Sequence, residues 1–250
     1  MKNNKIVIVT GGSRGIGFNI VTKLLSEKFK VICIARNTNT KKIKDIKSKF
    51  KKNFYHFDCN IANSEEVKNL FRNKISKIGD IYALINNAGI NPSRNILNKT
   101  SIQDWQNTIE TNINGTFYCT KYTIDQMLKT KSKGIVVMIS SIAGLVSMEK
   151  RASYATTKGA LLSLTKSIAA DYAKNNIRSF CICPAYIETE LTKPYLNKLS
   201  SKEYKSLLAL HKLNKLGKPD DISHMISFLL NDKTNWMTGN IISVDGGYIA

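Results

Sequence analysis

Short apolar, β-branched runs alternate with segments of helical periodicity from one end of the chain to the other, and this alternation restricts the fold most. The runs lie at 5–10, 30–35, 53–57, 80–86, 134–140, 177–183 and 240–244. The helical segments lie at 15–28, 41–51, 63–77, 101–130, 152–174 and 219–231. Consecutive apolar positions within a run are typical of strands buried on both faces of a parallel sheet. The sequence therefore predicts an α/β fold, a doubly wound parallel sheet of about seven strands with helices on both faces.

We expect residues 1–250 to form a single domain. The length of 250 residues is within the range of one domain, and no repeat, low-complexity tract or Pro/Gly/Ser-rich linker divides the chain. The segment 186–215 interrupts the alternation with a helical insertion. Ligands bind at the carboxyl ends of the strands in such sheets, so we expect this insertion to form a lid over the substrate.

Neither a membrane nor an oxidising compartment is indicated. The apolar run at 135–139 is much shorter than the ~20 residues that cross a bilayer, and the N-terminus leads directly into the first strand. The five cysteines are odd in number and form no Cys-x-x-Cys pair, which favours reduced thiols in a cytoplasmic protein. The three histidines lack the spacing of metal ligands, so no metal site is expected.

The formal net charge of +20 raises the question of nucleic-acid binding. Only 6 of the 38 basic residues are arginine, the side chain on which base recognition chiefly relies. The densest basic stretch, 41–52, carries Ile43, Ile46 and Phe50 at helical spacing, so we interpret its lysines as the solvated face of an amphipathic helix. We expect weak, salt-sensitive association with nucleic acid at most, and no specific recognition.

A glycine-rich turn, Thr10-Gly-Gly-Ser-Arg-Gly-Ile-Gly17, follows the first strand and opens the first helix. Its glycines permit a tight turn and close approach of a pyrophosphate, and the helix N-terminus supplies partial positive charge. An ordinary glycine-rich turn is the alternative, but the position between a strand and a helix favours a dinucleotide site. The candidate contacts here are Gly11, Ser13, Arg14, Gly15, Ile16 and Gly17.

The end of the second strand predicts NADP(H) in preference to NAD(H). An NAD site usually has an acidic residue about 20 residues past the glycines to bind the ribose 2′-hydroxyl, whereas an NADP site has arginine there. This stretch reads Cys33-Ile-Ala-Arg-Asn37, with Arg36 and no acid. Ser13 and Arg14 could join Arg36 around a 2′-phosphate. A solvated surface role is the alternative for Arg36, so the preference rests mainly on the missing acid.

Motifs at several strand ends resemble, in order and spacing, those of the short-chain dehydrogenase/reductase family. Besides the glycine turn they are Asn86-Asn-Ala-Gly89, Ser141 and Tyr154-Ala-Thr-Thr-Lys158. The match extends over essentially the whole chain, to Val244-Asp-Gly-Gly247. The resemblance implies a Rossmann-type domain, NAD(P)-dependent chemistry between a carbonyl and an alcohol, and a homotetramer.

Four residues are the candidate catalytic group. Tyr154 and Lys158 are one helical turn apart, so we expect the ammonium to lower the phenol pKa and make Tyr154 a general acid or base. Ser141 is expected to hydrogen-bond the same substrate oxygen. The resemblance assigns Lys158 also to the nicotinamide ribose, and Asn112 to a water that relays protons through Lys158. Each residue alone is as compatible with a structural role, and the combination favours catalysis.

The resemblance also assigns cofactor contacts residue by residue. Asp58 matches an acceptor for the adenine amino group, with a capping Asx turn as the alternative. Two positions depart from the family pattern: Phe180 stands where Asn is common, and Ala185 where Gly is common. We expect Phe180 to remove a polar tether and Ala185 to alter the loop if a positive φ is required there. The other assigned contacts are Cys59, Asn87, Ala88, Gly89, Tyr154, Lys158, Pro184, Ile187 and Thr189.

Within this family the segments 158–166, 187–190 and 236–247 look most like 3-oxoacyl-[acyl-carrier-protein] reductases. The resemblance implies NADPH-dependent reduction of the ketone of a 3-oxoacyl thioester, with acyl carrier protein as a candidate partner of the basic surface. Two alternatives stay open. One is an NAD(P)-dependent dehydrogenase of a sugar, polyol or hydroxy acid, and the other is a non-catalytic NADP-binding regulator.

Overall fold

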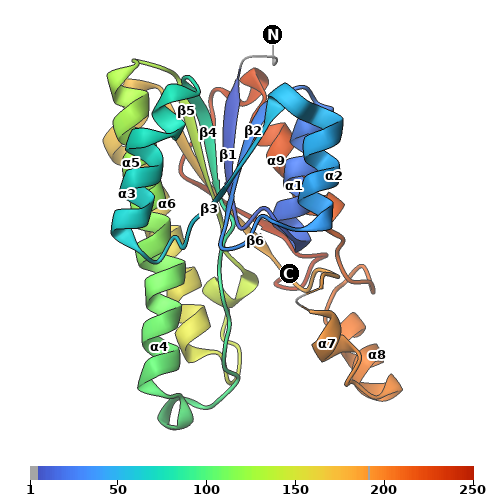
Figure 1. Ribbon diagram of the computed structural model, residues 1–250. Coiled ribbons are helices and arrows are strands. Elements are labelled where there is room, and N and C mark those ends of the chain that lie inside the picture. Colours follow the sequence, from blue (N-terminus) through green and yellow to red (C-terminus); the bar gives the residue numbers. More distant parts are fainter. Residues whose placement is uncertain (1–4, 191) are drawn as a thin grey trace.

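The computed structural model describes residues 5–190 and 192–250, and these form a parallel sheet of seven strands (Figure 1). The strand order is β3-β2-β1-β4-β5-β6-β7, and every neighbouring pair is parallel. The predicted strands are confirmed to within one residue at each end. Their bounds are β1 Ile6–Thr10, β2 Lys30–Ala35, β3 Phe54–Asp58, β4 Ile81–Asn86, β5 Gly134–Ile139, β6 Ile177–Pro184 and β7 Asn240–Val244.

Helices cover both faces of the sheet, as Figure 1 shows. On one face lie α1 (Gly15–Ser26), α2 (Lys41–Phe50) and α9 (Pro219–Leu229). On the other lie α3 (Ser64–Asn73), α5 (Gly115–Lys129) and α6 (Ala152–Tyr172). The doubly wound Rossmann-type architecture is therefore confirmed. In the described part of the chain, none of the helices has the length and apolarity to cross a membrane.

The sheet separates two apolar cores, which accounts for the unbroken apolar runs. In β1, Val7 and Val9 point toward α1, α2 and α9, whereas Ile6 and Ile8 point toward α3, α5 and α6. All four side chains are at most 2% exposed. Successive side chains of a strand point to opposite faces, so a strand covered on both sides needs apolar residues at every position.

One predicted helix, 101–130, is interrupted. The structure has α4 at Ile102–Ile109, a π-helical turn at Glu110–Asn114 and then α5. A π turn adds a residue to the helical turn, and the apolar periodicity of the sequence does not reveal it. Such turns occur frequently at functional sites, and this one contains Asn112.

The chain reverses its direction of travel across the sheet between β3 and β4, because β4 pairs with the other edge of β1. Ligands of open α/β sheets bind outside the carboxyl ends of the strands at such a switch point. The predicted insertion 186–215 contains two helices, α7 (Lys193–Leu196) and α8 (Ser201–Ala209). Both project from the carboxyl-end side of the sheet (Figure 1).

Candidate active site

A long cleft runs along the carboxyl ends of the central strands. It is lined by residues that follow β1, β2, β4, β5 and β6, together with the start of α6 and the first part of the insertion. The structure brings all the predicted site residues to its walls except Asn112 and Asp58. The cleft therefore brings together segments that are far apart in the sequence, from the glycine turn to the insertion.

Two glycines keep the first turn tight at one end of the cleft. Gly11 has a φ of +65°, and a Cβ on it would lie 2.9 Å from the Ala88 Cα atom. A Cβ on Gly17 would lie 2.3 Å from the Gly11 carbonyl oxygen. The N-cap residue of α1, Arg14, makes no side-chain hydrogen bond to the first turn, which leaves that turn's N–H groups directed at the cleft. The turn thus offers the donor set and the close backbone approach that a pyrophosphate requires.

Asn87 ties this glycine turn to the end of β4. Its Nδ2 donates to the Thr10 and Gly11 carbonyl oxygens at 3.0 and 3.2 Å. In the reverse direction, the Thr10 hydroxyl oxygen accepts from the backbone N–H groups of Asn87 and Ala88, both at 3.1 Å. The structure therefore gives Asn87 a scaffold role beside its predicted cofactor contact.

Basic side chains dominate the cleft where β2 ends. Arg36 is exposed there, and Arg14, Lys41 and Lys42 line the same region. Among the described residues that line the cleft, the only acid is Glu190, which pairs with Lys42. Sequence reasoning missed Lys41 and Lys42 as candidate contacts. Their signal was available, because both begin the helix that directly follows Arg36.

Asp58, the predicted acceptor for the adenine amino group, is exposed directly before the cleft-lining Cys59. Its Oδ1 accepts hydrogen bonds from the Thr38 N–H at 2.6 Å and the Thr38 hydroxyl at 2.7 Å, and these bonds lower the carboxyl pKa. The next residue, Cys59, does line the cleft, and burial raises its thiol pKa to about 11. Thr38 therefore holds the carboxylate through Oδ1, and the adenine contact of Asp58 stays a prediction.

Ser141, Tyr154 and Lys158 meet near the middle of the cleft. Tyr154 lies in the first turn of α6, and the Ser141 hydroxyl is within hydrogen-bonding reach of its phenol. Lys158 is 4% exposed, and its Nζ donates to the Ile139 carbonyl oxygen at 2.8 Å. The same Nζ lies 5.6 Å from the centre of the Tyr154 ring. The predicted catalytic group is therefore assembled, with a Ser–Tyr pair that can bind a single oxygen atom.

The expected lowering of the phenol pKa was wrong in sign. Burial raises the pKa of Tyr154 above its ordinary value of 10, and the Ser141 hydroxyl and the Arg151 charge offset only part of this rise. Burial also lowers the pKa of Lys158 to about 8. The loss of hydration opposes the charged form of each group and outweighs the effects of the neighbouring groups that favour it. Tyr154 consequently holds its proton at neutral pH, as a general acid must.

This buried ammonium predicts a pH-dependent stability. Between pH 8 and 10.5 the unfolded chain keeps the Lys158 proton that the folded chain has released, so the free energy of unfolding rises with pH across this window. Relative to Lys158→Met, we expect the wild type to gain about 2 kcal/mol between pH 7.5 and 10 in urea unfolding. Parallel pH profiles for the two proteins would show that Lys158 is not desolvated.

Asn112 lies behind the cleft wall and joins two of its elements. Its amide accepts from the Ile90 N–H at 2.8 Å and donates to the Ile90 carbonyl oxygen at 2.9 Å and the Thr157 hydroxyl at 3.0 Å. A Cβ placed on Gly89 would lie 3.3 Å from the Asn112 Oδ1 and 3.4 Å from the Lys158 Nζ. Both polar atoms thus flank the small space that Gly89 leaves open.

The two departures from the family pattern lie at different distances from the cleft. Phe180 is fully buried in the core between the sheet and α9, so it does not take the place of a polar tether in the site. Ala185 lines the cleft, and it is not among the described residues with positive φ. Nearby, Thr189 lies beside the glycine turn, since a Cβ on Gly15 would be 3.7 Å from the Thr189 Cβ.

Sequence reasoning missed the residues at the other end of the cleft, beyond Tyr154. Arg94, Arg151, Tyr186 and Tyr195 line this end. The available signal was Arg151, three residues before Tyr154 and so on the same side of the helix. Among the residues that the structure describes, no group of three or more His, Cys, Asp or Glu side chains is placed to hold a metal ion.

Comparison with known proteins agrees with this geometry. The family model described as Enoyl-(Acyl carrier protein) reductase matches residues 11–249. A 3-oxoacyl-[acyl-carrier-protein] reductase of Staphylococcus aureus is 33% identical over 250 residues, covering 99% of each chain. The structure of ElxO with NADP bound is 33% identical, with a TM-score of 0.89 and coverage of 100% of this chain and 99% of its own. A 4-hydroxyisoleucine dehydrogenase complexed with NADH is 31% identical, with a TM-score of 0.90 and 98% coverage of both chains.

These similarities extend over nearly the whole chain, and the matched residues 11–249 span the Asn86–Gly89 segment and the Ser141, Tyr154 and Lys158 group. The chain belongs to the short-chain dehydrogenase/reductase family of oxidoreductases, which act on CH–OH groups.

Proposed function

We propose that this protein reduces a ketone to a secondary alcohol with NADPH, and that a 3-oxoacyl thioester is the first candidate substrate. The observation that carries the proposal is the Ser141–Tyr154 pair in a cleft whose opposite end is basic. The names of the curated relatives favour the thioester. The family model's name instead refers to reduction of a carbon–carbon double bond, so an assay must compare the two bonds.

The residues present fit a dinucleotide with a 2′-phosphate. The first-turn N–H groups of α1 would bind the pyrophosphate, and Ser13, Arg14 and Arg36 would surround the 2′-phosphate. Ala88 and Gly89 would lie along the adenosine, and Pro184, Ile187 and Thr189 would hold the nicotinamide. Bound NADPH would supply a hydride to the carbonyl carbon.

Tyr154 supplies the proton in this proposal. Its phenol donates to the carbonyl oxygen as that oxygen gains charge, while the Ser141 hydroxyl donates a second hydrogen bond to the same oxygen. In the opposite direction Tyr154 would accept the alcohol proton. Because burial raises the phenol pKa, reduction is favoured at neutral pH, and oxidation should accelerate as the pH rises.

Lys158 and Asn112 would restore the Tyr154 proton. The Lys158 ammonium points into the space beside Gly89 that the Asn112 Oδ1 also borders. A water in that space would connect the two groups to solvent, and Lys158 would in addition hold the nicotinamide ribose. The Thr157 hydroxyl donates to the Tyr154 carbonyl oxygen at 2.8 Å and accepts from Asn112. It thereby fixes the position of Asn112 relative to α6.

Removal of the Arg36 side chain should affect the binding of the two cofactors differently. We expect Arg36→Ala to weaken NADPH binding by roughly 10- to 100-fold, because a charge-assisted contact to the 2′-phosphate is lost. NADH, which has a hydroxyl at that position, should bind with little change. Titrations followed by nicotinamide fluorescence measure both affinities, and Arg72→Ala, outside the cleft, is the matched control. Equal weakening of both cofactors, or tighter NADH binding to the wild type, would contradict this role.

A second candidate is oxidation or reduction between a hydroxy acid and an oxo acid. It is supported by the two arginines beyond Tyr154 and by the similarity to 4-hydroxyisoleucine dehydrogenase. Sugars and polyols are weaker candidates because their hydroxyl groups need no such charge.

In all these cases we propose one domain over 1–250, with 186–215 closing over the substrate as a lid.

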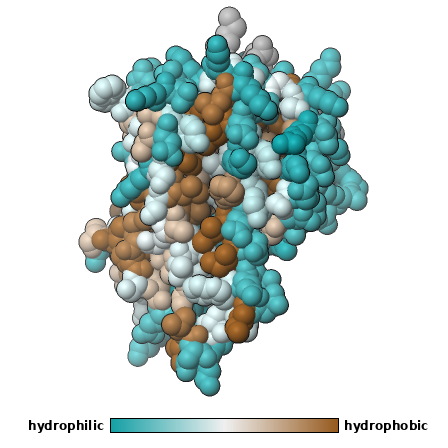
Figure 2. All heavy atoms as spheres, turned by 90° about the vertical axis from the view of Figure 1, so that its left-hand side faces the viewer, coloured by the Kyte–Doolittle hydropathy of each residue, from teal (hydrophilic) through white to brown (hydrophobic). Residues whose placement is uncertain are grey.

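We further propose a homotetramer in the cytoplasm. Figure 2 shows apolar side chains gathered on the outer face of the helix layer that contains α3 and α5. On this face Ile102 is 76% exposed, Phe117 49% and Leu128 37%, which is typical of surfaces that associate.

All five cysteines are buried and free, in accord with a reducing compartment. Light scattering measures the assembly directly.

A further inference from the structure

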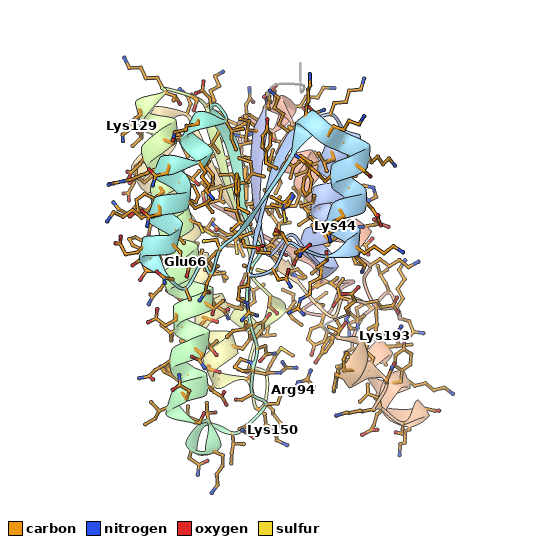
Figure 3. All side chains as sticks on the ribbon, in the orientation of Figure 1. Lys44, Glu66, Arg94, Lys129, Lys150 and Lys193 are labelled. Carbon is orange, nitrogen blue, oxygen red and sulfur yellow. The ribbon has the colours of Figure 1, made fainter. Side chains whose placement is uncertain are left out.

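The end of the cleft beyond Tyr154 contains two guanidinium groups. Arg94 lies on the loop between β4 and α4, and its side chain points toward the α7 side of the molecule (Figure 3). Arg151 is the N-cap residue of α6, one helical turn before Tyr154. Its backbone is outside the helical region, with φ −134° and ψ 17°, and its charge acts on the Tyr154 phenol. Arg151 therefore borders the place where the substrate carbonyl must lie.

Neither guanidinium has an acidic partner in the part of the chain that the structure describes. Arg151 reaches the Tyr186 hydroxyl, and Arg94 stacks on the Tyr195 ring with its Cζ 3.8 Å from the ring centre. Glu190, the only acid among the described cleft-lining residues, pairs with Lys42 beside Arg14. The positive charges at this end are thus held in place by aromatic groups and are left uncompensated.

This arrangement is unfavourable for the protein alone. Arg151 is half-buried, and both its loss of hydration and the neighbouring charge of Arg94 lower its pKa. Like charges that share a partly desolvated site repel each other, and an anion between them removes both penalties. Guanidinium groups also present paired N–H donors that match carboxylate and phosphate oxygens.

We propose that Arg94 and Arg151 bind an anionic group of the substrate, a carboxylate or a phosphate, located within a few bonds of the reacting carbonyl. This inference rests on the proposed reduction of a ketone at Tyr154. A 3-oxoacyl thioester has no anion within a few bonds of its ketone, so the subsite favours the second candidate, an oxo acid, or a phosphorylated ketone over the thioester. The anion is not changed in the reaction: the carbonyl carbon receives the hydride, the oxygen receives the Tyr154 proton, and the anionic group only orients the molecule.

Matched pairs of ketones test this subsite. Acetoacetate and methyl acetoacetate differ by one carboxylate charge, and dihydroxyacetone phosphate and dihydroxyacetone differ by one phosphate group, which carries about −1.5 to −2 at neutral pH. For each pair kcat/KM is measured with NADPH in the wild type, Arg151→Gln, Arg94→Gln and the control Arg72→Gln. We expect Arg151→Gln to lower kcat/KM for the charged member roughly 10- to 100-fold more than for the neutral member, mainly through KM, whereas any change in the Tyr154 pKa affects both members alike. The pair that responds identifies the carboxylate or the phosphate.

Three results would overturn the subsite: equal losses for charged and neutral members, no loss for either, or a loss equal to that of Arg72→Gln. Calorimetric binding of 3-hydroxybutanoate and its methyl ester to the NADP⁺-loaded protein provides a readout without turnover. If no ketone is reduced but the acid binds and Arg151→Gln abolishes that binding, the proposed reaction fails and the anion subsite stands. If ketones are reduced but acid and ester bind alike, the reaction stands and the subsite fails.

Discussion

Replacement of Tyr154 by phenylalanine should lower kcat for ketone reduction by roughly 10²- to 10⁴-fold, the range expected when a general acid is removed. The phenol is the only proton donor that the proposal places at the substrate oxygen, and burial keeps it protonated at neutral pH. Phenylalanine fills nearly the same volume, so α6 and the cleft wall should be preserved. NADPH affinity should therefore remain within about threefold of the wild-type value.

The measurement combines single-turnover kinetics on 3-oxobutanoyl-N-acetylcysteamine with a fluorescence titration of NADPH. A variant that loses cofactor binding as well would indicate a structural role for the hydroxyl. A variant that keeps most of its turnover would assign the proton to another group. Ser141→Ala serves as the graded comparison, with an expected loss of roughly 10²- to 10³-fold, because it removes one hydrogen bond and leaves the acid in place.

Gly17→Ala should have the second largest effect, on cofactor binding and stability together. The added methyl group would lie 2.3 Å from the Gly11 carbonyl oxygen and 2.4 Å from the Asn87 Nδ2, so the glycine turn or α1 must shift. Overpacking of this kind costs about 1–3 kcal/mol. The displaced turn should also raise the NADPH dissociation constant by roughly 100-fold, since it carries the pyrophosphate donors.

Gly159→Ala is the matched control, because Gly159 is also helical and a Cβ on it would meet only the Gly144 carbonyl oxygen, at 3.7 Å. Alanine in an open helical position stabilises by roughly 0.5–1 kcal/mol relative to glycine. Urea unfolding and NADPH titration of both variants give the comparison. If Gly17→Ala binds NADPH as tightly as Gly159→Ala does, the glycine turn is not the pyrophosphate site.

Local patterns in the sequence were sufficient to predict the elements of the fold. The strands were found because burial on both faces requires apolar residues at consecutive positions, as in Val7 and Ile8. The break at 110–114 was missed because the apolar periodicity does not reveal a π turn, and the residues that Asn112 contacts there, Ile90 and Thr157, are distant in sequence.

The site was predictable where its residues form compact motifs, and less so where distant segments meet. Gly11, Ser141, Tyr154 and Lys158 were found in this way, and the structure brings them together. The pKa of Tyr154 was misjudged because it depends on burial, which the i, i+4 spacing does not reveal. Arg94 was missed because it comes close to Arg151 only in the folded chain, where the loop after β4 meets the start of α6.

In the proposed reaction, this cleft transfers a hydride from NADPH to a carbonyl carbon. The most direct test supplies NADPH deuterated at C4, on the transferred face, together with 3-oxobutanoyl- and but-2-enoyl-N-acetylcysteamine and acetoacetate, and locates the deuterium by mass spectrometry and NMR. The proposal predicts deuterium on the carbinol carbon of a 3-hydroxy product, lost in Tyr154→Phe. Deuterium at C3 of a saturated thioester, or transfer from NADH but not from NADPH, would contradict it.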